Sequence, residues 1–409
     1  MDIRITPTRL NGEIAPPPSK SMAHRLIITA ALGSGVSTVR NVSFSQDIEA
    51  TLRCMEALGA VWEQDGEDVL HIQGIGNTPI TAGSDLPRFD CGESGSTLRF
   101  LIPVALAVAG GGVFTGRGRL MERPQKPYFD LFAEKGIFCQ QTDGVLTVRG
   151  TLTPGEYRLP GNVSSQFFTG LLLALSLLDA PSSIVSTTAL ESADYILMTI
   201  DAMENAGISV TVSEDRRTFH VTPAAYHPFD STVEADWSQA GFWYAANFLN
   251  SQLTLQGLNP RSSQGDMVVA DLYWKLARPG DTEIDLSGCP DLLPPLAVMA
   301  AVRSGTTRFV NAARLRIKES DRLATVHQIL TALGGQSEEL PDGLTVQGVA
   351  RLAGGIVDGA NDHRIVMAAA IAATACDAPV TILGAQAIRK SYPSFWDEYQ
   401  RLGGNIHVL

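Results

Sequence analysis

The sequence predicts an α/β protein of two or three domains, built from six copies of a repeated unit. Three observations lead to this prediction. The chain has 409 residues, more than a single hydrophobic core commonly holds. Segments with helical spacing of apolar residues that end in glycine recur along the chain, and almost wholly apolar segments alternate with them. Short strands follow both kinds of segment, which is typical of α/β folds.

The first kind of segment is an amphipathic helix, then a glycine, and then two strands joined by a turn. Apolar residues recur at i, i+3, i+4 and i+7, and the glycine suits a left-handed helix C-terminus. These glycines, separated by roughly 70 residues or twice that, are Gly59, Gly136, Gly207, Gly334 and Gly403. The copies occupy residues 52–74, 128–150, 196–222, 323–348 and 395–409. A degenerate fourth copy fits at 268–286, where Arg278-Pro-Gly replaces the glycine turn and a hairpin is missing.

The second kind of segment starts with small or polar residues and becomes almost wholly apolar, as expected of a buried helix. The six begin near residues 19, 94, 164, 236, 291 and 361. The start of a helix offers backbone N–H groups and a positive dipole end, so it binds anions. Ser, Asn and Asp at such positions are also ordinary N-caps. Because several of these starts carry Lys, Arg or Gln as well, we expect them to converge on one anion-binding region.

Composition excludes several classes of function. The net charge of −12 argues against nucleic acid as the main partner, and the apolar stretches are too short to cross a membrane. The five cysteines are far apart and odd in number, which fits a reducing compartment and disfavours a zinc site or a disulfide framework. The N-terminus is charged and lacks the apolar core of a signal peptide. We therefore expect a cytoplasmic protein with no metal and no membrane or nucleic-acid partner.

Basic residues mark the candidate site. Lys20 stands at the start of the first buried helix, where a cation is unfavourable unless an anion binds, and Ser21 and Arg25 share a face of that helix. The segment Lys318-Glu-Ser-Asp-Arg is expected to place Lys318, Glu319 and Arg322 on one helical turn, which taken alone would also suit a salt-bridged surface helix. Further candidates, each weak alone, are Arg123, Arg364 and Lys390.

Together these segments resemble the EPSP synthase family over the whole chain. The matching motifs, in the family's order, are Pro18-Ser-Lys-Ser with Arg25, Glu93-Ser-Gly-Ser-Thr-Leu-Arg, Glu122-Arg-Pro, Ser164-Ser-Gln, Pro290-Asp, Lys318-Glu-Ser-Asp-Arg, Asn361-Asp-His-Arg and Lys390-Ser-Tyr-Pro. The resemblance implies the two-domain enolpyruvyl transferase fold, an inside-out α/β barrel with three βαβαββ repeats in each domain. It also implies one domain of residues 1–18 plus 235–409, an inserted domain of residues 19–234, and an active site in the cleft between them.

The resemblance further implies an enzyme that moves the enolpyruvyl group of phosphoenolpyruvate onto the 5-hydroxyl of shikimate 3-phosphate and needs no cofactor. The shikimate 3-phosphate ligands would be Lys20, Ser21, Arg25, Ser164, Ser165, Gln166, Ser192, Tyr195, Asp291 and Lys318. The phosphoenolpyruvate ligands would be Lys20, Gly95, Arg123, Gln166, Arg322, Arg364 and Lys390. Asp291 would act as the base towards the hydroxyl, and Glu319, aided by Lys20, as the acid that protonates the methylene carbon. The family also leads us to expect a monomer. Gly95, which has no side chain, leads us to expect inhibition by glyphosate.

The chain departs from the family's pattern at three positions. Glu93 stands where the family often has Asn, and Phe100 where many members have Pro or another smaller residue. Arg314 stands where some members have Asn. Phe100 is the main reason to question glyphosate sensitivity. One alternative is the sister enzyme, UDP-N-acetylglucosamine enolpyruvyl transferase, which typically carries a cysteine in the loop before Arg123-Pro, and this loop has none. A second alternative is a non-catalytic binding protein on the same fold. The presence of Lys20, Asp291, Glu319 and Lys390 disfavours it.

Overall fold

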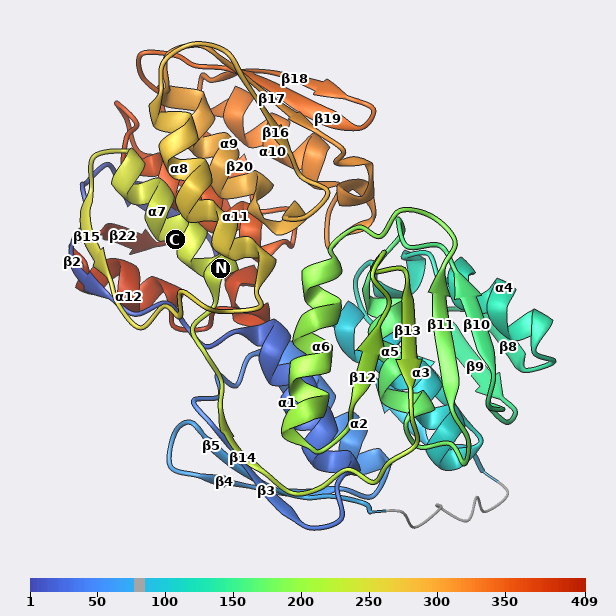
Figure 1. Ribbon diagram of the computed structural model, residues 1–409. Coiled ribbons are helices and arrows are strands. Elements are labelled where there is room, and N and C mark those ends of the chain that lie inside the picture. The colour runs from blue at the N-terminus through green and yellow to red at the C-terminus, as the bar shows by residue number, and fades with distance from the viewer. Residues whose placement is uncertain (77–84) are drawn as a thin grey trace. The chain divides into compact units, whose positions relative to one another are not determined.

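The computed structural model describes residues 1–76 and 85–409, and the chain divides into two compact units. Unit 1 consists of Met1–Pro17 and Ala235–Leu409, and unit 2 of Pro18–Glu234. Each unit has its own apolar core. In each unit the largely buried helices lie inside and the sheets lie towards the outside (Figure 1). The predicted α/β class is confirmed.

Unit 2 repeats one pattern of helices and strands. Its buried helices are α1 (Lys20–Leu32), α3 (Gly95–Ala109) and α5 (Gln166–Leu175), and its amphipathic helices are α2 (Gln46–Ala57), α4 (Lys126–Glu134) and α6 (Ala193–Asn205). The strands are β3 (Val36–Arg40), β4 (Val61–Asp65), β5 (Val69–Gln73), β6 (Arg88–Asp90), β7 (Gly111–Thr115), β8 (Phe138–Thr142), β9 (Val145–Arg149), β10 (Glu156–Leu159), β11 (Ser182–Ser186), β12 (Val210–Val212), β13 (Thr218–Val221) and β14 (Asp230–Thr232). Within the described part of this unit they form sheets ordered β14-β3-β5-β4, β6-β7-β9-β8 and β10-β11-β13-β12. Each sheet thus joins a parallel pair to an antiparallel hairpin.

Unit 1 uses the same pattern with two changes. Its buried helices are α7 (Trp237–Phe248), α9 (Leu293–Val302) and α11 (His363–Ala373), and the others are α8 (Val269–Ala277), α10 (Arg322–Ala332) and α12 (Phe395–Arg401). The strands are β1 (Ile3–Thr6), β2 (Asn11–Ile14), β15 (Gln252–Leu255), β16 (Thr282–Asp285), β17 (Thr306–Val310), β18 (Gln336–Leu340), β19 (Gly343–Gln347), β20 (Gly355–Asp358), β21 (Val380–Leu383) and β22 (Asn405–Val408). The sheets are ordered β16-β17-β19-β18, β20-β21-β1-β22 and, among the described residues, β15-β2 alone.

The two changes concern the fourth and sixth repeats. The parallel pair β15-β2 has no hairpin among the described residues, as the sequence predicted for the fourth copy. The sixth repeat ends with a single strand, β22, and the chain's first strand, β1, inserts antiparallel between β21 and β22. That pairing joins segments from the two ends of the chain, and no local pattern in the sequence indicated it.

The recurring glycines end helices as predicted. Gly59, Gly136, Gly207, Gly334 and Gly403 have φ values of 93°, 68°, 82°, 83° and 93°, in the left-handed region that favours glycine. The fourth copy instead ends α8 at Arg278 in an extended conformation. The buried Arg303 guanidinium completes this helix end by donating to the carbonyls of Leu276, Arg278 and Gly280.

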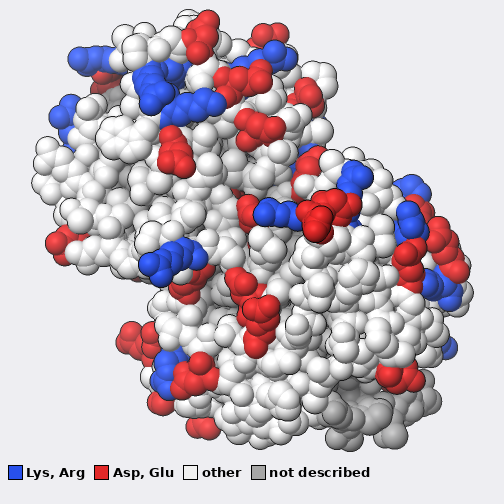
Figure 2. All heavy atoms as spheres, in the orientation of Figure 1, with Lys and Arg blue, Asp and Glu red and all other residues white. Residues whose placement is uncertain are grey.

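Charged side chains of both signs are intermingled over the face drawn in Figure 2, with uncharged areas between them. In the described part of the chain, no helix is long and apolar enough to cross a bilayer. The described residues also include no group of three or more His, Cys, Asp or Glu side chains placed to hold a metal ion.

Candidate active site

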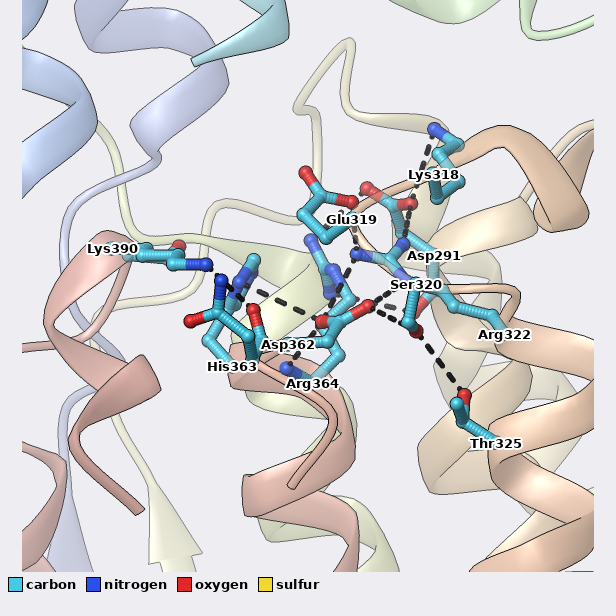
Figure 3. Close-up of polar contacts among 12 residues, drawn as sticks. Asp291, Lys318, Glu319, Ser320, Arg322, Thr325, Asp362, His363, Arg364 and Lys390 are labelled. Carbon is cyan, nitrogen blue, oxygen red and sulfur yellow. Dashed lines mark hydrogen bonds and ion pairs between the residues drawn. The ribbon is translucent and has the colours of Figure 1, made fainter. Parts of the chain in front are cut away.

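Asp291 is the centre of a charged cluster in unit 1 (Figure 3). It lies in the single 3₁₀ turn Pro290–Leu292 that leads into α9, and its side chain is 16% exposed. Its Oδ1 accepts from Arg322 Nη1 at 2.8 Å and lies 3.5 Å from Lys318 Nζ, while Oδ2 accepts from Arg364 Nη2 at 3.0 Å. Three cations therefore surround one carboxylate.

Arg322 connects this carboxylate to two others. Its side chain is 1% exposed, and it donates through Nε to Asp362 Oδ2 at 2.8 Å and through Nη2 to Glu319 Oε2 at 2.7 Å. A guanidinium can hold several carboxylates at once because its donors form a planar fork. The expectation that Lys318, Glu319 and Arg322 share one helical turn is wrong. Asp321 is the N-cap of α10 and Arg322 its first residue, so Lys318 and Glu319 belong to the non-helical turn before it, with Lys318 extended. The burial of Arg322 also rules out the surface-helix interpretation.

The N-terminal ends of the three buried helices of unit 1 meet at Arg364. Asp362 caps α11 by accepting from the Arg364 backbone N–H at 3.0 Å. The Arg364 guanidinium donates to Ser238 Oγ in the first turn of α7 and to the Asp291 carboxylate just before α9. Lys390, at the end of the 3₁₀ helix Ala385–Lys390, donates to the Asn361 carbonyl at 2.6 Å, beside the same helix start. The predicted convergence of helix starts is thus present within this unit.

The cluster shifts the ionisation of its members. Burial works against the charged form of Asp291, but Arg364, Lys318 and Arg322 outweigh it and hold the pKa of this carboxyl well below its usual range. Burial likewise opposes ionisation of Asp362, and Arg322 lowers its pKa below the usual value. Burial also lowers the pKa of Lys318. Asp291 is therefore an ionised carboxylate held by cations, which makes it a weak base until those cations are drawn towards another anion.

In unit 2, Lys20 and Arg25 extend from the first two turns of α1. Lys20 Nζ lies 2.7 Å from Asp47 Oδ2 on α2, so a carboxylate meets the cation at this helix start. Arg25 is 1% exposed and donates to the Ser21 and Tyr195 carbonyls and to the hydroxyls of Thr199 and Thr169. Arg25 therefore connects helix α1 with both α5 and α6.

A second group surrounds the start of α3. Gly95 is the first residue of that helix, and a Cβ atom placed on it would lie 2.8 Å from Arg123 Nη1 and 3.6 Å from Gln166 Oε1. Gln166, the first residue of α5, donates to Ser96 Oγ at 3.0 Å and accepts from Arg99 Nη1 at 2.8 Å. The sequence motif contained Arg99, but its role in orienting Gln166 was not predicted. Asp47 and Asp362, which hold Lys20 and Arg322, were also missed.

The other predicted residues of unit 2 lie at helix starts. Ser165 is the N-cap of α5, and the Ser164 hydroxyl accepts from the Gln166 backbone N–H at 3.3 Å. Ser192 is the N-cap of α6, in a left-handed conformation with φ of 53°, and Tyr195 lies in the first turn of that helix. The predicted site residues in unit 2 are thus Lys20, Ser21, Arg25, Gly95, Arg123, Ser164, Ser165, Gln166, Ser192 and Tyr195, and those in unit 1 are Asp291, Lys318, Glu319, Arg322, Arg364 and Lys390.

The positions where the sequence departs from the family's pattern have local explanations. Phe100 is fully buried, with the Arg25 guanidinium 5.0 Å above its ring centroid and the His24 ring edge-on to it. The Glu93 carboxylate packs against Gly118, where a side chain would clash with it. The buried Arg314 donates to the Ser287 carbonyl.

Comparison with known proteins places the chain in a family. Residues 5–399 match the family model described as EPSP synthase (3-phosphoshikimate 1-carboxyvinyltransferase). Proteins from Clostridium novyi and Clostridium kluyveri, both named 3-phosphoshikimate 1-carboxyvinyltransferase, are each 42% identical to the chain, covering 99% of it and 98% of their own length. An EPSP synthase from Acinetobacter baumannii has the same fold, with a TM-score of 0.79 over 100% of both chains at 22% identity. The enolpyruvyl transferase NikO from Streptomyces tendae has a TM-score of 0.78, covering 99% of this chain and 98% of its own, at 16% identity. The chain belongs to the EPSP synthase family.

Proposed function

We propose that the protein transfers the enolpyruvyl group of phosphoenolpyruvate to the 5-hydroxyl of shikimate 3-phosphate and releases inorganic phosphate. The observation that carries the proposal is the cluster in which Arg322 and Arg364 hold the Asp291 carboxylate, with Lys318 and Glu319 beside it. Both substrates are polyanions, and paired guanidinium groups bind phosphate and carboxylate well. Membership of the EPSP synthase family supports the same activity.

The addition step of the proposed reaction has two proton transfers. Asp291 accepts the proton of the 5-hydroxyl while the hydroxyl oxygen bonds to C2 of the enolpyruvyl group. Glu319, aided by Lys20, gives a proton to the methylene carbon, which yields a tetrahedral intermediate. In the elimination step the Glu319 carboxylate takes a proton back from the resulting methyl group while the bond between C2 and the phosphate oxygen breaks, and the double bond is restored. The departing phosphate accepts the proton held by Asp291. Atoms and electrons balance without a cofactor, and we propose none.

The substrate sites follow the same assignment. We propose that shikimate 3-phosphate is bound by Lys20, Ser21, Arg25, Ser164, Ser165, Gln166, Ser192, Tyr195, Asp291 and Lys318. We propose that phosphoenolpyruvate is bound by Lys20, Gly95, Arg123, Gln166, Arg322, Arg364 and Lys390. These sets draw on both units, so the proposal requires that residues 1–18 plus 235–409 and residues 19–234 act as two domains around a shared cleft. Such an arrangement would exclude water when the cleft closes. We further propose a monomeric cytoplasmic enzyme that glyphosate inhibits.

The test is phosphate release by the purified protein with both substrates present and with each omitted in turn. We expect release that needs both substrates and that disappears in Asp291→Ala and in Lys20→Ala. Release with UDP-N-acetylglucosamine in place of shikimate 3-phosphate would overturn the acceptor assignment. Binding of both substrates, measured by calorimetry, without any turnover would indicate a non-catalytic protein on the same fold.

A further inference from the structure

Four buried side chains of unit 2 form a continuous chain of hydrogen bonds across three helices. His24 Nδ1 on α1 lies 2.7 Å from Thr51 Oγ1 on α2, which lies 2.6 Å from Thr97 Oγ1 on α3. Thr97 Oγ1 is in turn 2.7 Å from the Oγ of Ser94, the N-cap of α3. All four residues are at most 1% exposed. We call this set, His24, Thr51, Thr97 and Ser94, the hydroxyl chain.

With Thr97 Oγ1 as the donor to Ser94 Oγ, one direction of donation follows along the hydroxyl chain. Thr97 Oγ1 donates to Ser94 Oγ, so its single proton is used and Thr51 Oγ1 must donate to it. The proton of Thr51 is then used as well, so His24 must donate to Thr51 through an Nδ1–H group. In this direction of donation His24 is the neutral tautomer with its proton on Nδ1. Burial, together with Lys20 and Arg25, lowers the pKa of His24 well below its ordinary value, which agrees with a neutral ring.

These threonines differ from ordinary buried threonines. Thr29, one turn further along α1, donates back to the carbonyls of Arg25 and Leu26 in its own helix, which is the usual way a helix satisfies a buried hydroxyl. Thr51 instead bonds to His24 of α1 and to Thr97 of α3, and Thr97 bonds to Thr51 of α2 as well as to its own N-cap, Ser94. His24 Nε2 also has no hydrogen-bond partner among the described residues. A buried nitrogen without a partner costs free energy, so packing alone does not explain a histidine here.

The hydroxyl chain complements the contacts of the next residue, Arg25. Arg25 connects helix α1 with both α5 and α6 through Thr169, Thr199 and the Tyr195 carbonyl. His24 binds α1 to α2 and, through Thr51 and Thr97, to the first turn of α3. Phe100 packs against both, edge-on to His24 and under the Arg25 guanidinium. Two adjacent residues of α1 thus align it with four neighbouring helices, in two separate directions.

We propose that His24 is a positioning residue for the transferase reaction, which acts through Thr51 and Thr97 to fix the start of α3, with Gly95 and Ser96, against the start of α1, with Lys20. The inference rests on the proposed function. In that assignment Gly95 belongs to the phosphoenolpyruvate site alone, and Lys20 and Gln166 contact both substrates. Gln166 also donates to Ser96. The shikimate 3-phosphate residues of α1, α5 and α6 are aligned by Arg25 instead. Loss of the hydroxyl chain should therefore affect phosphoenolpyruvate binding and turnover more than shikimate 3-phosphate binding.

The principal test is Thr51→Val, which keeps the shape of the side chain and removes the central hydroxyl. We expect kcat/KM for phosphoenolpyruvate to fall by about 10- to 100-fold, the range that a small misplacement of reacting groups produces. We expect KM for shikimate 3-phosphate to stay within about twofold, because Arg25 and its partners are untouched. His24→Asn and His24→Leu form a second pair. Asn presents an amide N–H near the place of Nδ1 and should retain most of the activity, whereas Leu fills space without a donor and should not.

The matched control is Tyr226→Phe. The Tyr226 hydroxyl contacts Ser176 Oγ at 2.9 Å and the Leu173 carbonyl at 3.0 Å, so the variant also removes a buried hydroxyl network, but at the far end of α5. It should lower the melting temperature like Thr51→Val and leave the kinetics unchanged. Three outcomes would overturn this inference and leave the proposed function standing. They are wild-type kinetics in a folded Thr51→Val protein, equal losses of activity in His24→Asn and His24→Leu, and an equal rise in the KM values for both substrates. An inactive wild-type protein would overturn the proposed function as well.

Discussion

Asp291 Oδ1 lies 2.8 Å from Arg322 Nη1, so the residue proposed as the base and a residue proposed to bind phosphoenolpyruvate form an ion pair with each other. The other oxygen of the carboxylate is 3.0 Å from Arg364 Nη2. An anionic substrate on these two guanidinium groups would compete with Asp291 for their donors. Such competition would weaken the hold on the carboxylate and raise its pKa towards the range where it is a useful base.

Replacing Asp291 by Asn should separate catalysis from binding. The amide side chain of Asp291→Asn would keep the shape but could not accept the hydroxyl proton, so we expect kcat to fall by about 10²- to 10⁴-fold. A neutral amide competes less strongly for Arg322 and Arg364, so KM for phosphoenolpyruvate should be unchanged or lower. Steady-state kinetics with each substrate varied would measure both. Asp377→Asn, which loses the exposed pair with Arg351, is the control, and a kcat for Asp291→Asn close to that of the wild type would refute the base assignment.

The low pKa of Asp291 predicts how stability depends on pH. A carboxyl whose pKa is depressed in the folded state stabilises the fold above its unfolded pKa of about 3.9 and loses that contribution as pH falls through the folded pKa. The wild type should therefore melt at a higher temperature than Asp291→Asn at pH 7. The difference should stay constant down to about pH 4 and shrink in more acidic solution. Melting curves between about pH 7 and about pH 3 would test this, and a difference that grew on acidification would contradict it.

Arg322 should matter for stability as well as for activity. Arg322→Met would leave Asp291, Glu319 and Asp362 without their shared partner. Breaking a buried ion pair by removing one partner typically costs about 3–5 kcal/mol. Arg316 offers a matched control, because it also joins two carboxylates, Asp321 and Glu339, but is 28% exposed. Arg316→Met should cost about 1 kcal/mol or less. Denaturant unfolding would compare them, and equal losses would show that burial of the Arg322 network contributes little.

The local features of this fold could be predicted from sequence, and the long-range ones could not. Apolar spacing and the glycines at positions such as Gly59 and Gly334 located the helices and their ends, because those signals lie within a few residues of each other. The insertion of β1 between β21 and β22 depends on contacts between the two ends of the chain. The same limit applies to the site. The motif around Lys318 indicated charged residues, but only the packing of α10 against α11 reveals Asp362 as the partner of Arg322.

Arg303 should hold the fourth repeat together. This repeat lacks the glycine that ends the other amphipathic helices, and Arg303 supplies donors to the carbonyls of Leu276, Arg278 and Gly280 instead. Arg303→Met would leave these carbonyls without their donors, so we expect a loss of about 2–4 kcal/mol. Both KM values should stay unchanged, because no proposed ligand is touched. Arg351→Met is the exposed control, and a melting temperature as high as that of Arg351→Met would refute the role of Arg303.

Gly95→Ala should narrow the proposed phosphoenolpyruvate site without unfolding the protein. The new Cβ would lie 2.8 Å from Arg123 Nη1, too close for an undisturbed contact, but the end of an arginine side chain can move at little cost in stability. Since Arg123 would then leave its position, we expect KM for phosphoenolpyruvate to rise by about tenfold, as loss of one ionic hydrogen bond implies. KM for shikimate 3-phosphate should change little. If glyphosate occupies the same space, as we propose, its inhibition constant should rise as well. Gly288→Ala, where the added methyl group meets no atom within 4 Å, is the control. An unchanged KM for phosphoenolpyruvate in a folded Gly95→Ala protein would remove Gly95 and Arg123 from the proposed site.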